Sequence, residues 1–145
     1  MSGVDDNLYV KPLEELLPHR APLLLLDGYE IEGESFSAQV LIKKESLLFE
    51  ESLGVPSWAG IEYMAQAAGV LAATLLSNET TEEPAVGFLV KVKSLKTTVD
   101  YYQRDQKLNV KIDALHMGKR ESLFKGSIWV NEKKMSEAHF MTFLK

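Results

Sequence analysis

The sequence predicts an α+β fold in which a curled antiparallel sheet of about six strands wraps around one long helix. Residues 57–76 are almost wholly apolar and contain no proline, as in a single buried helix. Alternating apolar and polar stretches, typical of strands with one buried face, lie before and after this segment. A sheet built from such strands has to curl around the helix to bury it, so we expect one domain over residues 1–145.

The composition is that of an ordinary globular protein. The chain has 145 residues, of which 46% are hydrophobic and 26% charged. It contains no cysteine, which excludes disulfides, thiolate metal sites and a cysteine nucleophile. The polar, acidic N-terminus is unlike an export signal, so we expect a cytoplasmic protein. A net charge of -5 disfavours general binding to nucleic acids or anionic membranes.

The first elements precede the long helix. We expect a short helix around residues 12–17 and an interrupted strand over 23–32. Residues 35–42 alternate apolar and polar side chains, which predicts a half-buried strand. The turn Gly33-Glu34 is expected to pair these two strands.

The helix at 57–76 would be costly as a membrane span. Glu62 and Gln66 are polar, and no basic residue flanks the segment on either side. We therefore expect a central helix of a folded domain and no membrane insertion.

Four further strands are expected after a polar loop at 77–85. Their predicted ranges are 86–98, 107–116, 122–130 and 134–143, with tight connections at 100–105, 117–120 and 131–133. One sheet leaves the other side of the helix and a sheet edge uncovered, which favours a dimer.

Glu62 and Gln66 lie four residues apart and should share one helix face, which continues through Gly69 and Ala73. The small residues would leave room for a neighbouring backbone or an extended apolar ligand. The carboxylate is either catalytic or simply satisfied by backbone amides or an opposing subunit.

The segment "SLGVPS" just before the helix offers backbone N–H groups that would suit the carbonyl oxygen of a thioester. It is equally compatible with an ordinary loop that leads into a helix through Pro56 and a Ser57 cap.

Several segments together resemble a known family. "LLPHRAPLLLLDGYEI", "PSWAGIEYMAQAAG", "VGFLVKVKSLKTTVDYYQRDQKLNVKIDAL" and "SLFKGSIWVNEKKMSEAHFM" occur in the order found in the hot-dog-fold 3-hydroxyacyl-[acyl-carrier-protein] dehydratases of fatty acid synthesis. The version "GVPSWAGIEYMAQ" is most similar to the dehydratase-like branch of aryl-polyene and related polyketide-type lipid pathways.

The resemblance implies a dimer acting on 3-hydroxyacyl thioesters carried on phosphopantetheine of an acyl carrier protein or on CoA, without another cofactor or a metal. It assigns the helix carboxylate to Glu62 and its amide partner to Gln66. The backbone donors for the thioester oxygen correspond approximately to Gly54 and Val55. In such enzymes a histidine removes the proton alpha to the thioester, and the carboxylate serves the leaving hydroxyl.

That histidine is missing, because its place is taken by Leu48. His19 belongs to "LPHR", where a structural role is expected, and His116 and His139 lie in predicted strands. Three interpretations stay open. The chain is a dehydratase with another base, or it completes a mixed dimer with another hot-dog protein, or it is a thioesterase that uses the helix carboxylate.

Several lysines and aromatic residues have two possible roles each. Lys91 and Lys93 should share a strand face, with Lys96 on the same strand and the basic turn at 119–120 later in the chain. These basic residues either bind an acidic carrier protein or form a solvated strand face that protects a sheet edge. The aromatic residues near the site are expected to line an acyl channel or to pack in the core or interface. They are Trp58, Tyr63, Tyr101 and Tyr102.

Overall fold

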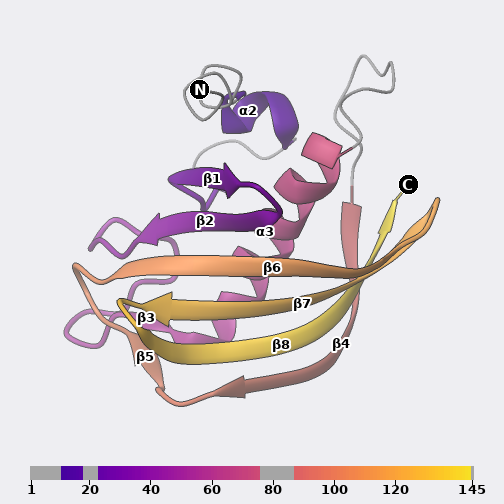
Figure 1. Cartoon of the computed structure of the whole chain (residues 1–145). Coiled ribbons are helices and arrows are strands. Elements are labelled where there is room, and N and C mark those ends of the chain that lie inside the picture. The colour runs from indigo at the N-terminus through magenta and orange to yellow at the C-terminus, as the bar shows by residue number, and fades with distance from the viewer. Residues whose placement is uncertain (1–10, 18–22, 76–86, 145) are drawn as a thin grey trace.

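A computed structural model describes residues 11–17, 23–75 and 87–144, and six of its strands form one antiparallel sheet in the order β1-β2-β6-β7-β8-β4. In that order the strands are β1 (Gly28–Glu32), β2 (Ser35–Leu41), β6 (Lys107–Met117), β7 (Glu121–Val130), β8 (Lys133–Leu144) and β4 (Gly87–Thr97). The sheet curls in front of a long helix, α3 (Gly60–Leu75) (Figure 1). This is the predicted α+β hot-dog arrangement.

The helices match the sequence closely. α2 (Leu13–Leu16) is the expected short helix, and α3 is preceded by a 3-10 turn, η1 (Ser57–Ala59). Together η1 and α3 cover the predicted range as far as the description extends. The loop at 77–85 and His19 lie outside the described residues.

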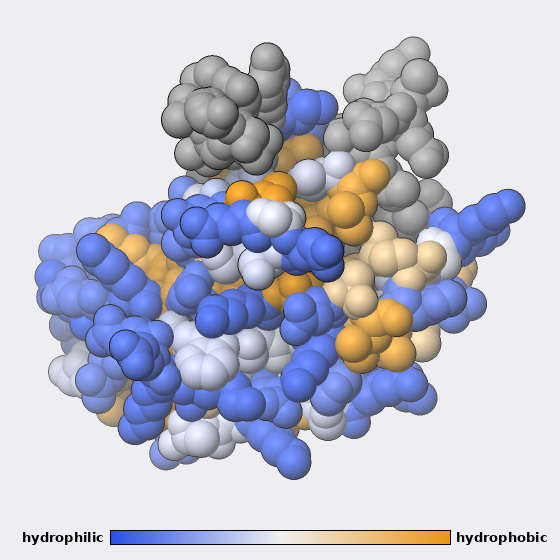
Figure 2. Space-filling view, in the orientation of Figure 1, coloured by the Kyte–Doolittle hydropathy of each residue, from blue (hydrophilic) through white to orange (hydrophobic). Residues whose placement is uncertain are grey.

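The two faces of the sheet differ sharply. The inner face packs on α3 with alternate residues of β2, β6 and β7, including Phe36, Ala38 and Val40 of β2 as predicted. Gly126 belongs to this face because a Cβ atom there would lie 2.6 Å from the sulfur of Met64 on α3. The outer face is mainly hydrophilic (Figure 2). The core therefore lies between the sheet and the helix, and the outer face borders solvent.

Three turns lie where the sequence predicts them. Gly33, with φ +61°, and Glu34 connect β1 to β2, in which Glu32 pairs with Ser35. Asn131 and Glu132 connect β7 to β8, and residues 118–120 connect β6 to β7.

Three details differ from the predictions. Residues 23–27 are not a strand, and β1 begins only at Gly28. The predicted tight connection at 100–105 contains β5 (Tyr101–Tyr102), which pairs with β3 (Val55–Pro56) in a second, two-stranded sheet. Register irregularities in β4 on either side of Lys91 and Val92 break the strict alternation expected for Lys91 and Lys93.

Candidate active site

Glu62 and Gln66 occupy the same side of α3, one helical turn apart. The side-chain amide of Gln66 donates a hydrogen bond to Glu62 Oε2 at 3.2 Å. Gln66 is 2% exposed and Glu62 is half-buried. The helical spacing therefore predicts the proximity of the two groups correctly.

Gln66 also bonds to the extended segment that contains Leu23 and Leu25. Its Nε2 donates to the carbonyl oxygen of Leu23 at 2.9 Å, and its Oε1 accepts from the backbone N–H of Leu25 at 2.9 Å. The amide thus takes the place of a neighbouring strand, which explains why the apolar run has backbone partners without joining the sheet at this point.

The small residues farther along α3 accommodate a segment of the same chain. A Cβ atom on Gly69 would approach Leu17 Cδ2 to 3.0 Å. Leu17 follows α2 directly and is 3% exposed. The room expected near Gly69 is therefore occupied by Leu17.

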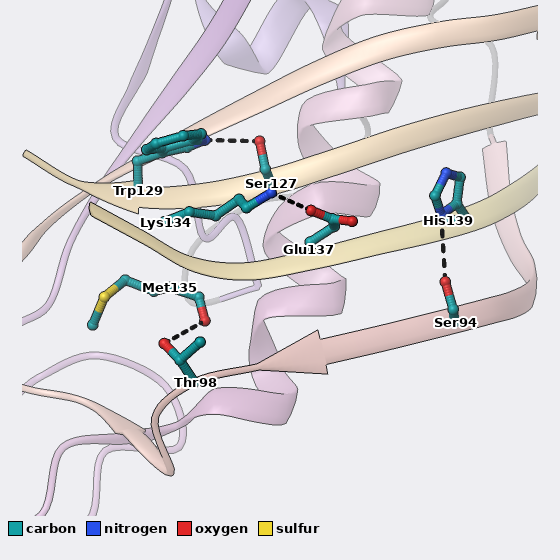
Figure 3. A network of polar contacts seen from close by, with 8 residues as sticks. All are labelled: Ser94, Thr98, Ser127, Trp129, Lys134, Met135, Glu137 and His139. Atoms are coloured by element: carbon teal, nitrogen blue, oxygen red, sulfur yellow. Dashed lines mark hydrogen bonds and ion pairs between the residues drawn. The ribbon is translucent and has the colours of Figure 1, made fainter. Parts of the chain in front are cut away.

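The two described histidines lie away from the carboxylate. His139 is on the outer face, between the buried Ala138 and Phe140, with its Nδ1 3.4 Å from Ser94 Oγ (Figure 3). His116 is exposed and pairs with Leu123 across β6 and β7. Since α3 packs on the other face of the sheet, neither ring faces Glu62.

The loop before α3 presents apolar side chains to solvent. Leu48, at the expected position of the histidine, has φ +72° and is 46% exposed. Leu47, Leu53 and Trp58 are 40%, 48% and 59% exposed. Clustered exposed apolar residues often mark a surface that contacts a partner or a ligand.

The backbone of Gly54 and Val55 makes hydrogen bonds and strand pairing within the chain itself. The N–H of Gly54 donates to the carbonyl oxygen of Glu50 at 2.9 Å, and Val55, fully buried, pairs with Tyr102 in the small sheet. Gly54 has φ +106°, and a Cβ atom there would lie 2.2 Å from Tyr102 O. The sequence analysis expects these backbone N–H groups to point toward a substrate. In the structure Gly54 instead bonds within the turn, and Val55 pairs within the small sheet.

Tyr63 is buried beside a pocket of about 260 Å³. Its hydroxyl makes no hydrogen bond to any residue in the described parts of the chain. Burial, and then the proximity of Tyr102 and Asp27, raises the pKa of Tyr63 far above its usual range, so the phenol stays protonated. A buried donor at the wall of a pocket is available to a ligand.

The pocket also contains residues that the sequence analysis did not single out as functional. Five of its ten lining residues are aliphatic, and Asp27, Lys43 and Glu45 add charge. Asp27 accepts a hydrogen bond from the N–H of Leu41 at 2.6 Å, which fixes the carboxylate beside β2. The only sequence signal for Asp27 is its position at the end of the apolar run.

The described residues contain neither a membrane-spanning helix nor a cluster of metal ligands. No described helix has both the length and the apolar character needed to cross a membrane. Within the same residues, His, Asp and Glu side chains form no group of three or more that would hold a metal ion.

Comparison with known proteins adds an independent finding. The model of the ApeP-like family, described as ApeP dehydratase, matches residues 11–145. The 3-hydroxyacyl-[acyl-carrier-protein] dehydratase FabZ of Chlamydia pneumoniae is 37% identical over 84 residues, which cover 53% of this chain and 55% of the relative. The chain thus spans about half the length of the curated relatives it matches.

Solved structures confirm the fold. A chain of the dehydratase heterocomplex ApeI:P from Xenorhabdus doucetiae has a TM-score of 0.84 and 23% identity, covering 94% of this chain and 92% of that one. A hypothetical thioesterase from Streptococcus pneumoniae, solved with coenzyme A, has a TM-score of 0.62 and 16% identity, with coverage of 83% and 88%. At these identities the similarities establish the fold alone.

Proposed function

Because the chain belongs to the ApeP-like dehydratase family, we propose that it takes part in the dehydration of 3-hydroxyacyl thioesters as the Glu62-bearing subunit of a two-chain hot-dog dehydratase. The second subunit would supply the histidine that this chain lacks at Leu48. The substrate would arrive on the phosphopantetheine of an acyl carrier protein in the cytoplasm, and no further cofactor is needed.

The position of Glu62 carries this proposal. The carboxylate lies beside a buried amide on the central helix, whereas His116 and His139 are on the opposite side of the sheet. A general base has to come within hydrogen-bond reach of the proton it removes, directly or through one water molecule. Neither ring can do so at Glu62 without a large change in the fold.

The chemistry divides between the two subunits. The partner's histidine would remove the proton alpha to the thioester, and Glu62 would donate a proton to the beta-hydroxyl, which leaves as water. A 2-enoyl thioester remains. Gln66 is a positioning residue, because its amide connects Glu62 to the backbone at Leu23.

Two aromatic residues would contact the substrate or the partner. Tyr63 lines a pocket that is half aliphatic, and its buried hydroxyl would suit a neutral acyl segment. Trp58 is exposed in the apolar loop before α3 and would be covered by the second subunit or by the acyl chain.

The similar structure from Xenorhabdus doucetiae is named as a dehydratase heterocomplex, which supports a two-chain assembly as the proposal for this protein. The chain has exposed apolar side chains at Leu47, Leu48 and Leu53, as expected of a surface that a second subunit covers.

The proposal is tested with a 3-hydroxyacyl pantetheine thioester and a hot-dog homologue that has histidine at the position of Leu48. We expect enoyl formation when both chains are present and essentially none with this chain alone. The homologue is also assayed alone, and the mixture should exceed its rate. Full activity of this chain alone would refute the two-chain proposal, and release of thiol without enoyl formation would indicate a thioesterase.

A further inference from the structure

The pocket of about 260 Å³ beside Tyr63 lies next to the candidate active site but is separate from it. Of the described residues that line it, none is Glu62 or Gln66. Leu25 belongs to both regions, because it lines the pocket while its N–H bonds to Gln66 Oε1 at 2.9 Å. An apolar cavity of about 150 Å³ in another protein binds benzene, so this pocket has room for a ligand of about ten non-hydrogen atoms.

The pocket is charged at its mouth and closed at its inner end. Asp27, Lys43 and Glu45 are exposed, whereas Tyr63 is 3% exposed. At neutral pH two carboxylates and one ammonium group leave the mouth with an excess of negative charge. Since half of the lining residues are aliphatic, an ion that moved inward would lose part of its hydration. These features favour a neutral ligand with an apolar body.

The pocket wall holds a hydrogen-bond donor and an acceptor that do not bond to each other. The hydroxyl of Tyr63 has no partner among the described residues, and burial, then Tyr102 and Asp27, raise the pKa of Tyr63 above its usual range. The effect of Asp27 on this phenol means that its carboxylate lies nearby. Asp27 Oδ2 accepts from the N–H of Leu41 at 2.6 Å, and no residue in the described parts of the chain donates to Oδ1. Both groups are therefore available to a ligand.

We propose that this pocket binds a neutral ligand through an amide group, whose oxygen accepts from the hydroxyl of Tyr63 and whose N–H donates to Asp27. An amide supplies both partners without a charge. A carboxylate supplies no donor and would add a second negative charge beside Asp27. An ammonium group supplies no acceptor for the phenol proton, and a hydrocarbon segment supplies neither group. Methylene groups on either side of the amide would pack on Leu24, Leu25 and Val40.

Such an amide could come from two sources. The pantetheine arm of a carrier-bound substrate contains amide groups separated by methylene groups, and this source alone rests on the proposed function. A free amide that acts as an effector is the other source. Because Leu25 contacts both the pocket and Gln66, either ligand would restrain the segment that bonds to Gln66.

The test follows the backbone amide chemical shifts of the whole chain by NMR during titration with hexanamide, hexanoate or hexylammonium, which are nearly equal in size. Hexanamide should shift the signals of Leu25 and Leu41 and bind at least about fivefold more tightly than either ion. In Tyr63→Phe the affinity for hexanamide should fall about fivefold to tenfold, because one hydrogen bond is lost. Tyr101→Phe is the matched control, since this hydroxyl bonds outside the pocket, and it should bind hexanamide as wild type does.

A second variant tests the charge of the acceptor. Asp27→Asn keeps an oxygen for the N–H of Leu41 and removes the negative charge, so it should bind hexanoate more tightly than wild type does. An unchanged urea midpoint verifies that each variant is folded. Titration with pantetheine separates the two sources. Competition with hexanamide at the same residues identifies the arm, whereas binding of hexanamide alone identifies an effector site.

Three results would overturn the inference. They are the absence of shifts at the pocket residues with hexanamide, binding of either ion as tightly as hexanamide, and an unchanged affinity for hexanamide in Tyr63→Phe. None of these results depends on turnover, so the proposed function and this inference can fail separately.

Discussion

The side-chain amide of Gln66 donates to Glu62 Oε2 at 3.2 Å while the same side chain bonds the backbone of Leu23 and Leu25 at 2.9 Å. One buried group therefore fixes both the helix carboxylate and the extended segment beside it. Such a group combines a stabilising role with a positioning role, and the two can be measured separately.

Replacing Gln66 with methionine keeps its approximate volume and removes all three hydrogen bonds. The carbonyl of Leu23 and the N–H of Leu25 then lose their partner, and we expect a loss of about 2–4 kcal/mol in the free energy of unfolding. Urea denaturation measures it. Gln39→Met is the matched control, because the amide of Gln39 makes only a 3.5 Å contact with Ser37 Oγ. An equal loss in both variants would contradict the role given to Gln66.

Two buried tyrosines should respond differently to loss of the hydroxyl. Tyr102 OH lies 2.7 Å from Ser136 Oγ, so Tyr102→Phe should cost about 1–2 kcal/mol. Tyr63→Phe should change the free energy of unfolding by less than about 0.5 kcal/mol, since no described residue accepts its hydrogen bond. Chemical denaturation of the pair tests this. A cost for Tyr63→Phe as large as that for Tyr102→Phe would show that the hydroxyl of Tyr63 has a structural partner.

Stability should fall at alkaline pH. Burial raises the pKa of Tyr102 to about 12, partly offset by the hydrogen bond with Ser136, from about 10 in the unfolded chain. The folded state therefore holds this proton more tightly, and its contribution to stability is fully present below pH about 10 and lost as the pH rises toward 12. Urea midpoints measured across this range should decline less steeply in Tyr102→Phe. An unchanged slope would argue against the raised pKa.

Gly54 should not tolerate a side chain. A Cβ atom there would lie 2.2 Å from Tyr102 O, at φ +106°, so Gly54→Ala should cost about 3 kcal/mol or more and loosen the small sheet. Gly33 also has a positive φ, but a Cβ atom there meets nothing within 4 Å, so Gly33→Ala should cost only about 1–2 kcal/mol. Thermal unfolding compares the two. Similar losses would mean that the close approach to Tyr102 does not matter.

The sequence predicts the sheet and central helix well because their signals are local. Alternation at Phe36, Ala38 and Val40 reports a strand with one buried face, and the uninterrupted apolar run reports the helix. The need to bury that helix predicts the curl of the sheet, and the family resemblance identifies the arrangement as a hot-dog fold, which the matching family and structures confirm.

The differences arise from long-range partners. Leu23 and Leu25 bond to Gln66, more than 40 residues away, and no local pattern reveals this. The pairing of Val55 with Tyr102 likewise joins two short segments with no strand-like alternation. The same pairing includes part of the loop that was predicted to offer free backbone N–H donors. Only part of the site could therefore be predicted from the sequence.

The most direct test of the two-chain account is the rate of enoyl formation by Glu62→Gln in the complex with the histidine-bearing homologue. Loss of the acid should lower the rate by about 100-fold to 10,000-fold, while sedimentation shows the complex intact. Glu30→Gln, an exposed carboxylate on β1, is the matched control and should leave the rate unchanged. A Glu62→Gln complex as active as wild type would contradict the account.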